Sequence, residues 1–220
     1  MNKPELLLPA GDIEKMKFAL AFGADAVYLG IPRFSLRARE NGFKDLSDVA
    51  LAIDYAHSLR KKAYVTANIF AHNLKVRSFV KYTEEILSVC RPDAWIISDP
   101  GLVMLMREHF PSENIHISVQ SNVMNYASAL FWKKTGAKRI ILSREITIAE
   151  MKEIHEGCPD VELESFVHGS MCMAYSGRCL ISNYLAHRDS NQGLCTNSCR
   201  WQYKVLTTPS APPIDRKSVV

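Results

Sequence analysis

Apolar and polar residues alternate along the chain on two length scales, with short β-branched runs separated by longer amphipathic stretches. Short continuous apolar runs predict buried strands, and apolar residues spaced three and four apart predict helices. The expected strands are residues 5–9, 26–30, 62–68, 94–99, 115–120, 139–143 and 161–167. The expected helices are residues 12–22, 47–60, 75–90, 101–109, 124–135 and 147–156. This order is typical of a parallel sheet covered by helices.

Residues that favour helix ends support these boundaries. Asp12 stands at an expected N-cap, Ser47 can cap the next helix, and Thr147 is followed three residues later by Glu150, as in a capping box. Glycines stand where three helices are expected to end, at Gly23, Gly136 and Gly157. The sequence therefore marks both ends of several helices.

Seven strands separated by helices predict an α/β fold, a parallel (β/α) barrel of the TIM type that is incomplete or irregular. An open doubly wound sheet is the alternative, and the missing Gly-rich dinucleotide-binding turn favours the barrel. An eighth strand is not obvious, although residues 201–205 could supply it. We expect a barrel domain over residues 1–205, with a cysteine segment at 168–200. Residues 206–220 contain three prolines and are expected to be a tail or a truncated linker to a further C-terminal domain.

Composition places few limits on function. The chain has 220 residues, 47% hydrophobic and 23% charged, which is ordinary for a soluble domain that needs no disulfide or metal to fold. Its net charge of +4 permits a nucleic-acid partner without requiring one. We see no secretory signal and no run of the ~20 apolar residues that a membrane helix needs. We therefore expect a cytoplasmic protein with reduced thiols and no membrane partner.

Four of the six cysteines fall within one short stretch. They are Cys172, Cys179, Cys195 and Cys199. Clustered thiols in a reducing compartment indicate a metal centre, and four thiolates suit either an iron–sulfur cluster or structural zinc. Zinc sites usually contain two short Cys-x2–4-Cys pairs, which the first spacing does not fit, so the cluster is favoured and zinc is the alternative. The other two, Cys90 and Cys158, are expected to be buried thiols.

Polar residues follow several expected strands, at the end where barrels of this type carry their chemistry. The candidate substrate-binding residues are Asn68, Gln120, Ser143, Arg144 and Glu145. Amide, carboxylate and guanidinium groups together suit a small anionic molecule. The alternative is that each one caps a helix or pairs with a neighbour.

Two further groups are candidates for chemistry and for RNA binding. His168 precedes the cysteines and could act as an acid–base group, and Glu164 on the same strand could point into the barrel. The alternative for the histidine is a supporting role beside the metal. Arg33, Arg37 and Arg39 follow the second strand and could bind phosphates, although a solvated loop is the alternative.

Residues 164–172 (ESFVHGSMC) and 176–182 (SGRCLIS) resemble the signature of the U32 peptidase family, and the likeness extends over residues 3–205. The closest resemblance is to members that help make 5-hydroxyuridine at the wobble position of tRNA. The resemblance implies a barrel, a [4Fe–4S] cluster on the four clustered cysteines, and oxygen-independent hydroxylation with prephenate as the donor. It also implies a further C-terminal domain in such members. Related members act on ribosomal RNA, and an older label is collagenase-like protease. A hydroxylase of ribosomal RNA, a peptidase and a non-enzymatic RNA-binding or cluster scaffold are therefore the alternatives, and the oligomeric state stays open.

Overall fold

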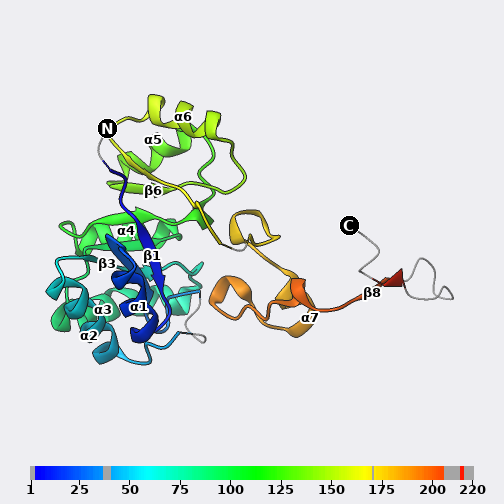
Figure 1. Ribbon diagram of the computed structural model, residues 1–220, viewed down its shortest axis with the longest axis horizontal. Coiled ribbons are helices and arrows are strands. Elements are labelled where there is room, and N and C mark those ends of the chain that lie inside the picture. Colours follow the sequence, from blue (N-terminus) through cyan, green and yellow to red (C-terminus); the bar gives the residue numbers. More distant parts are fainter. Residues whose placement is uncertain (1–2, 37–40, 170, 206–213, 216–220) are drawn as a thin grey trace.

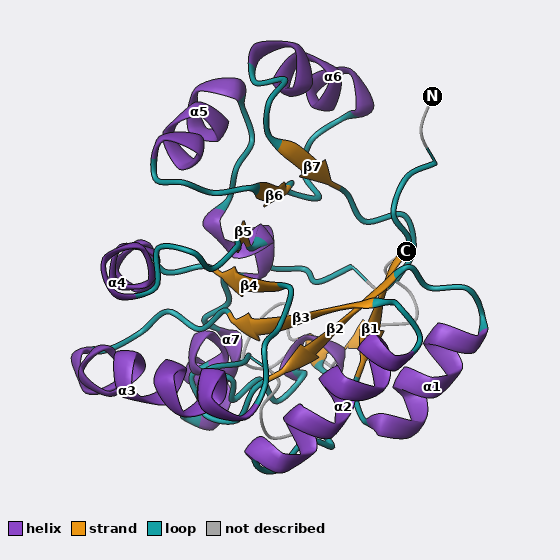
Figure 2. Cartoon of the chain, turned by 90° about the vertical axis from the view of Figure 1, so that its left-hand side faces the viewer, coloured by secondary structure: helices purple, strands orange, loops and turns teal. Residues whose placement is uncertain are grey.

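Seven parallel strands form one curled sheet in this computed structural model, which describes residues 3–36, 41–169, 171–205 and 214–215. The strands are β1 (Leu7–Ala10), β2 (Ala26–Gly30), β3 (Lys62–Ala67), β4 (Ala94–Ile97), β5 (Ile115–Ile117), β6 (Arg139–Ile141) and β7 (Glu162–Glu164). Each strand pairs with the next one along the chain, so the sheet order equals the sequence order. Figure 2 shows the sheet curling into a half-barrel of the TIM type, as predicted.

Six helices connect these strands and lie outside the curled sheet (Figure 2). They are α1 (Ile13–Ala21), α2 (Leu46–Ser58), α3 (Asn73–Val89), α4 (Pro100–His109), α5 (Tyr126–Lys134) and α6 (Ile148–Gly157). Strand–helix–strand repeats place every helix on the same side of the sheet, because right-handed crossovers between adjacent strands all turn the same way. None of the helices in the described part of the chain is long and apolar enough to cross a membrane.

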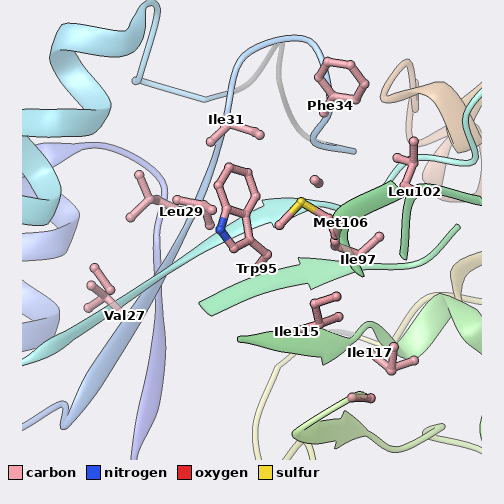
Figure 3. Close-up of a cluster of buried hydrophobic side chains, with 14 of the residues drawn as sticks. Val27, Leu29, Ile31, Phe34, Trp95, Ile97, Leu102, Met106, Ile115 and Ile117 are labelled. Carbon is pink, nitrogen blue, oxygen red and sulfur yellow. The ribbon is translucent and has the colours of Figure 1, made fainter. Parts of the chain in front are cut away.

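The main core fills the space between the outer face of the sheet and the helices (Figure 3). Val27 and Leu29 alternate along β2 toward this core, and Trp95 and Ile97 do the same on β4. All four side chains are fully buried. Burying such a side chain contributes roughly 1.5–3 kcal/mol, so this layer holds the half-barrel together.

Two local expectations are corrected by the structure. Ser47 does not cap α2, because Asp45 accepts hydrogen bonds from the backbone N–H of Ser47 and Asp48 and takes the N-cap position itself. Residues 201–205 do not complete the barrel. Instead β8 (Lys204–Val205) pairs antiparallel with β9 (Ile214–Asp215) in a separate two-stranded ribbon. The N-cap at Asp12 and the Thr147–Glu150 capping box are confirmed.

A network of charged side chains lies at the amino ends of the strands. Glu5, just before β1, accepts hydrogen bonds from Arg139 Nη1 on β6 and from Tyr64 Oη on β3, both at 2.7 Å. Arg139 also contacts Glu162 at 2.6 Å and Glu164 at 3.4 Å on β7. Within the described residues the two edge strands β1 and β7 are not hydrogen-bonded to each other, so this network links them across the open side of the half-barrel.

Burial alone would raise the pKa of Glu5, but hydrogen bonds from Arg139, Lys62 and Tyr64 outweigh it and lower the pKa to about 2. Burial raises the pKa of Glu164, and Arg139 offsets this only in part. Arg139 lowers the pKa of both carboxyls, but its effect together with Lys62 and Tyr64 exceeds that of burial at Glu5, whereas burial prevails at Glu164. The fold therefore stabilises the ionised form of Glu5 and disfavours the ionised form of Glu164.

Candidate functional site

The cysteine segment, residues 168–200, lies against the loops at the carboxyl ends of the strands (gold to orange in Figure 1). Its described part contains one short helix, α7 (Ile181–Ala186), and three 3-10 turns at Tyr175–Gly177, Ser190–Gln192 and Ser198–Arg200. The carboxyl ends of parallel strands are where barrels of this type carry their functional groups. Two groups of contacts attach the segment there.

Ser176 makes the first attachment. Glu145 accepts its N–H at 2.6 Å. Its Oγ lies 2.9 Å from Asn122 Oδ1, 3.0 Å from a Glu145 carboxylate oxygen and 2.9 Å from Ser143 Oγ, so the two acceptors share its one hydroxyl proton. The residue is completely buried and has a φ of 48°. A left-handed conformation costs a non-glycine residue roughly 1–2 kcal/mol. The hydrogen bonds to three loop residues therefore offset strain in the turn.

Asn191 and Gln192 make the second attachment, to the loop between β3 and α3. The Phe70 N–H donates to Asn191 O at 3.1 Å, and the Gln192 side chain donates to Phe70 O. The Asn191 side chain also holds both sides of Cys179, accepting from its N–H at 3.2 Å and donating to its carbonyl at 3.0 Å. Asn191 thus fixes the backbone of one cysteine to the edge of the barrel.

Arg178 joins the two attachments. Its Nε donates to Gln120 O at 2.8 Å, and its guanidinium carbon lies 4.9 Å from the centroid of the Phe70 ring. This is the geometry of a cation–π contact, worth about 0.5–1 kcal/mol at an exposed site. The segment is therefore held by hydrogen bonds, by one cation–π contact and by little apolar packing.

The four clustered cysteines are free thiols, of which Cys195 is exposed and the other three are partly exposed. The Asn197 N–H donates toward Cys195 Sγ at 3.4 Å. Thiolates are ligands that both iron–sulfur clusters and zinc prefer. Among the described residues, however, no three His, Cys, Asp or Glu side chains are grouped to hold a metal. A metal centre on these four cysteines stays a prediction.

The predicted substrate-binding residues all lie at this end of the barrel, but most are engaged with the protein itself. Asn68 Oδ1 accepts the Leu36 N–H at 3.0 Å, and Gln120 Oε1 accepts from Ser98 and Ser118. Ser143 and Glu145 hold Ser176, as described above. Burial raises the pKa of Glu145, but the hydrogen bonds from Ser176 outweigh it, and the net shift is downward. Glu145 is therefore ionised at neutral pH.

Arg144 is the member of this set with the least engaged side chain. Its guanidinium carbon lies 5.5 Å from the centroid of the Phe166 ring, and it forms no ion pair with another described residue. Its role in binding a small anion stays a prediction. Arg144 is partly exposed, so a ligand can reach it.

The candidate catalytic residues lie apart. His168 is exposed in the connection after β7 and makes no hydrogen bond or ion pair with another described residue. Glu164 is the last residue of β7, and its side chain contacts Arg139 of the charged network at 3.4 Å. Their catalytic roles stay predictions.

Of the three candidate RNA-binding arginines, Arg33 is exposed in the loop after β2. Arg37 and Arg39 lie outside the described residues. The sequence interpretation missed Lys75, which lies next to Arg33, and the attaching roles of Asn122 and Asn191. A lysine in the first turn of a helix was the one available signal, because the helix dipole disfavours a cation there.

The neighbouring hydroxyls of Ser143 and Ser176, with Glu145, are not an exposed nucleophile. Both serines are buried, and Ser176 Oγ is hydrogen-bonded to Ser143, Asn122 and Glu145. A hydrolytic serine needs a base beside it and access to substrate. This cluster serves to attach the cysteine segment.

A TIM-type half-barrel that carries a cysteine-rich segment at the carboxyl ends of its strands defines the class of this protein. The profile described as Peptidase family U32 matches residues 11–218. The chain belongs to the U32 peptidase family.

Curated relatives extend this likeness over nearly the whole chain. It is 56% identical over 203 residues to tRNA hydroxylation protein P of Haemophilus influenzae, covering 92% of this chain and 44% of that protein. It is 54% identical over 205 residues to the Escherichia coli protein of the same name, covering 93% of this chain and 45% of that protein. The 23S rRNA 5-hydroxycytidine C2501 synthase of Escherichia coli is 34% identical, over 92% of this chain and 30% of that enzyme. The chain thus spans less than half the length of these relatives.

A solved structure of a U32 peptidase has the same fold. Its TM-score is 0.62 at 14% identity, with 75% of this chain and 70% of that chain covered. At such low identity the likeness concerns the fold alone. It agrees with the half-barrel described above.

Proposed function

We propose that this chain is the barrel part of an RNA hydroxylase that acts on tRNA in the cytoplasm and hydroxylates the wobble uridine. One observation carries the proposal: the identity of 54–56% to two tRNA hydroxylation proteins extends over 92–93% of the chain, including the cysteine segment. The relation to a ribosomal RNA hydroxycytidine synthase supports hydroxylation of an RNA pyrimidine as the shared chemistry.

We further propose that Cys172, Cys179, Cys195 and Cys199 hold a [4Fe–4S] cluster. The support is the donor set, the exposure of the thiols, and the backbone N–H directed at Cys195. Such a cluster would supply electron transfer or a structural centre, since four protein thiolates leave no open iron position. Zinc at the same residues is the outcome that would redirect the proposal.

We also propose that a small anionic donor, prephenate by family resemblance, binds at the carboxyl ends of the strands. Arg144 is the group that would hold its carboxylate, because arginine binds carboxylates through two parallel hydrogen bonds. Gln120, Ser143 and Glu145 would shape the site indirectly, since they anchor the segment that covers it.

Gene deletion tests the function. The gene is deleted in the organism that carries it, and 5-hydroxyuridine in total tRNA is measured by mass spectrometry. We expect the modified nucleoside to disappear and to return with the full-length gene. Unchanged hydroxyuridine after deletion would refute the proposal.

Anaerobic purification of the full-length protein tests the cofactor. We expect about four iron and four sulfide per chain, lost in Cys195→Ser and kept in Cys90→Ser. Cys90 is a matched control because it is buried and its Sγ donates to Ile86 O, a bond that serine can keep. Colourless protein with one zinc per chain would refute the cluster and indicate that the four cysteines bind zinc.

A further inference from the structure

Two cations lie side by side at the same end of the barrel as the cysteine segment. Arg33 is in the loop after β2, and Lys75 is in the first turn of α3. Lys75 Nζ donates to the backbone oxygen of Arg33 at 2.6 Å. Neither side chain forms an ion pair with any carboxylate in the described ranges. The chain thus holds two like charges together with no described counter-ion.

Aromatic rings support both cations from the protein side. The Arg33 guanidinium carbon lies 5.0 Å from the centroid of the Tyr82 ring, and Lys75 Nζ lies 5.2 Å from the centroid of the Phe34 ring. These two rings stack with their centroids 5.2 Å apart. Phe34 is fully buried and Tyr82 is nearly so, and this burial holds the two rings in place against the cations. Cation–π contacts orient the charges and leave their hydrogen-bond donors available for an anion.

Several features of this pair are unfavourable in the absence of an anion. Burial and the neighbouring Arg33 lower the pKa of Lys75. A cation in the first turn of a helix also opposes the helix dipole. Arg33 has a φ of 74°, in the left-handed region that non-glycine residues seldom adopt. An anion bound between the two side chains would relieve the charge repulsion and the dipole opposition together.

The position of the pair relates it to the cysteine segment. Phe70, in the loop that leads from β3 into α3, is hydrogen-bonded to Asn191 and Gln192. Lys75 lies only five residues after Phe70 in the chain. One short loop therefore connects the attachment of the cysteine segment to the cation pair.

We propose that Arg33 and Lys75 bind a backbone phosphodiester of the RNA substrate and so position the RNA beside the cysteine segment. This rests on the proposed function. Arginine binds phosphate through paired donors and lysine adds a compact charge, a combination suited to one phosphate. The exposure of Arg33 favours a polymer backbone over a small donor, because small ligands are usually enclosed in a pocket. Phosphate contacts position a nucleic acid without reading its sequence.

The test uses the full-length protein and two variants, Arg33→Gln and Lys75→Gln. Lys17→Gln is the matched control, because Lys17 is exposed on α1, lies 5.4 Å from the centroid of the Tyr55 ring, and forms no ion pair with a described residue. Binding of tRNA and of an unrelated RNA hairpin is measured by fluorescence anisotropy between 50 and 200 mM salt. Circular dichroism checks that each variant is folded.

We expect each of the two variants to weaken binding of both RNAs by roughly fivefold to tenfold, and to lower the slope of log affinity against log salt by about one. Lys17→Gln should match the wild type. Wild-type affinity and slope in both variants would overturn the inference. So would a loss confined to tRNA, which would indicate base recognition.

Two further arms separate the possible failures. If both variants keep RNA affinity but raise the KM for prephenate, the pair binds the small donor and the inference is wrong. If wild-type protein restores hydroxyuridine while the variants bind RNA normally, the inference fails and the proposed function stands. If wild-type protein neither binds RNA nor restores hydroxyuridine, both fail.

Discussion

Replacing Glu5 by glutamine tests the charged network that links the two edges of the half-barrel. The substitution keeps the shape of the side chain but removes the charge that Arg139, Lys62 and Tyr64 contact. The pKa of Glu5 falls from 4.5 to about 2 on folding. At 1.36 kcal/mol per pKa unit, this corresponds to at most about 3 kcal/mol of stability at neutral pH. Arg139 keeps its carboxylates on β7, so we expect a loss of about 2–3 kcal/mol.

The pH dependence follows from the direction of the shift. A carboxylate whose folded pKa is lowered stabilises the fold fully above its unfolded pKa and loses that contribution as pH falls toward its folded pKa. The difference between wild type and Glu5→Gln should therefore be complete at pH 7 and shrink between about pH 4.5 and pH 2. With these pKa values it should be about 1.4 kcal/mol smaller at pH 3.5 than at pH 7.

Urea unfolding followed by circular dichroism at pH 7, 5 and 3.5 measures this difference. Glu164→Gln is the matched control, because burial raises the pKa of that carboxyl and its contact with Arg139 is longer, at 3.4 Å. We expect the control to cost less than about 1 kcal/mol at pH 7. Equal losses in the two variants, or a Glu5→Gln difference that does not change with pH, would refute the reasoning.

Two further substitutions test local features of the fold. Ser176→Ala removes the hydroxyl bonded to Asn122 and Glu145, so hydrogen exchange in the cysteine segment should speed up while the barrel keeps its protection; unchanged exchange there would contradict the attachment. Asp45→Ala should lower the free energy of unfolding by about 1 kcal/mol in urea titrations, and Ser47→Ala by a few tenths, because Asp45 provides the cap of α2. A larger loss in the free energy of unfolding for Ser47→Ala than for Asp45→Ala would show that Ser47 is the capping residue.

The half-barrel could be predicted from the sequence because each strand is a buried apolar run and each helix has a clear period. The strand expected at residues 115–120 shows where that reasoning stops. β5 ends at Ile117, and Gln120 lies in a 3-10 turn that brings its side-chain oxygen to Ser98 and Ser118. Local propensity cannot show that such polar groups find partners on neighbouring strands.

The candidate site was predictable only in its chemistry. Four cysteines close together in the sequence indicate a metal site, but nothing in their spacing shows how the segment meets the barrel. Ser176 reaches its partners through a left-handed turn, and Asn191 through a loop far away in the sequence. Arg33 and Lys75 are 42 residues apart and meet only because β2 and β3 are adjacent. Such contacts depend on the tertiary fold.

The two ends of the half-barrel use charge differently. At the amino ends of the strands, Arg139 is surrounded by carboxylates and tied to Glu5 across the open side. At the carboxyl ends, Arg33 and Lys75 have no such described partners. Neutralised charge stabilises a fold, whereas unneutralised charge that the fold holds in place can bind an oppositely charged ligand. Glu5→Gln should therefore lower the free energy of unfolding without changing the RNA affinity of the folded protein. Lys75→Gln should lower the RNA affinity without lowering the free energy of unfolding.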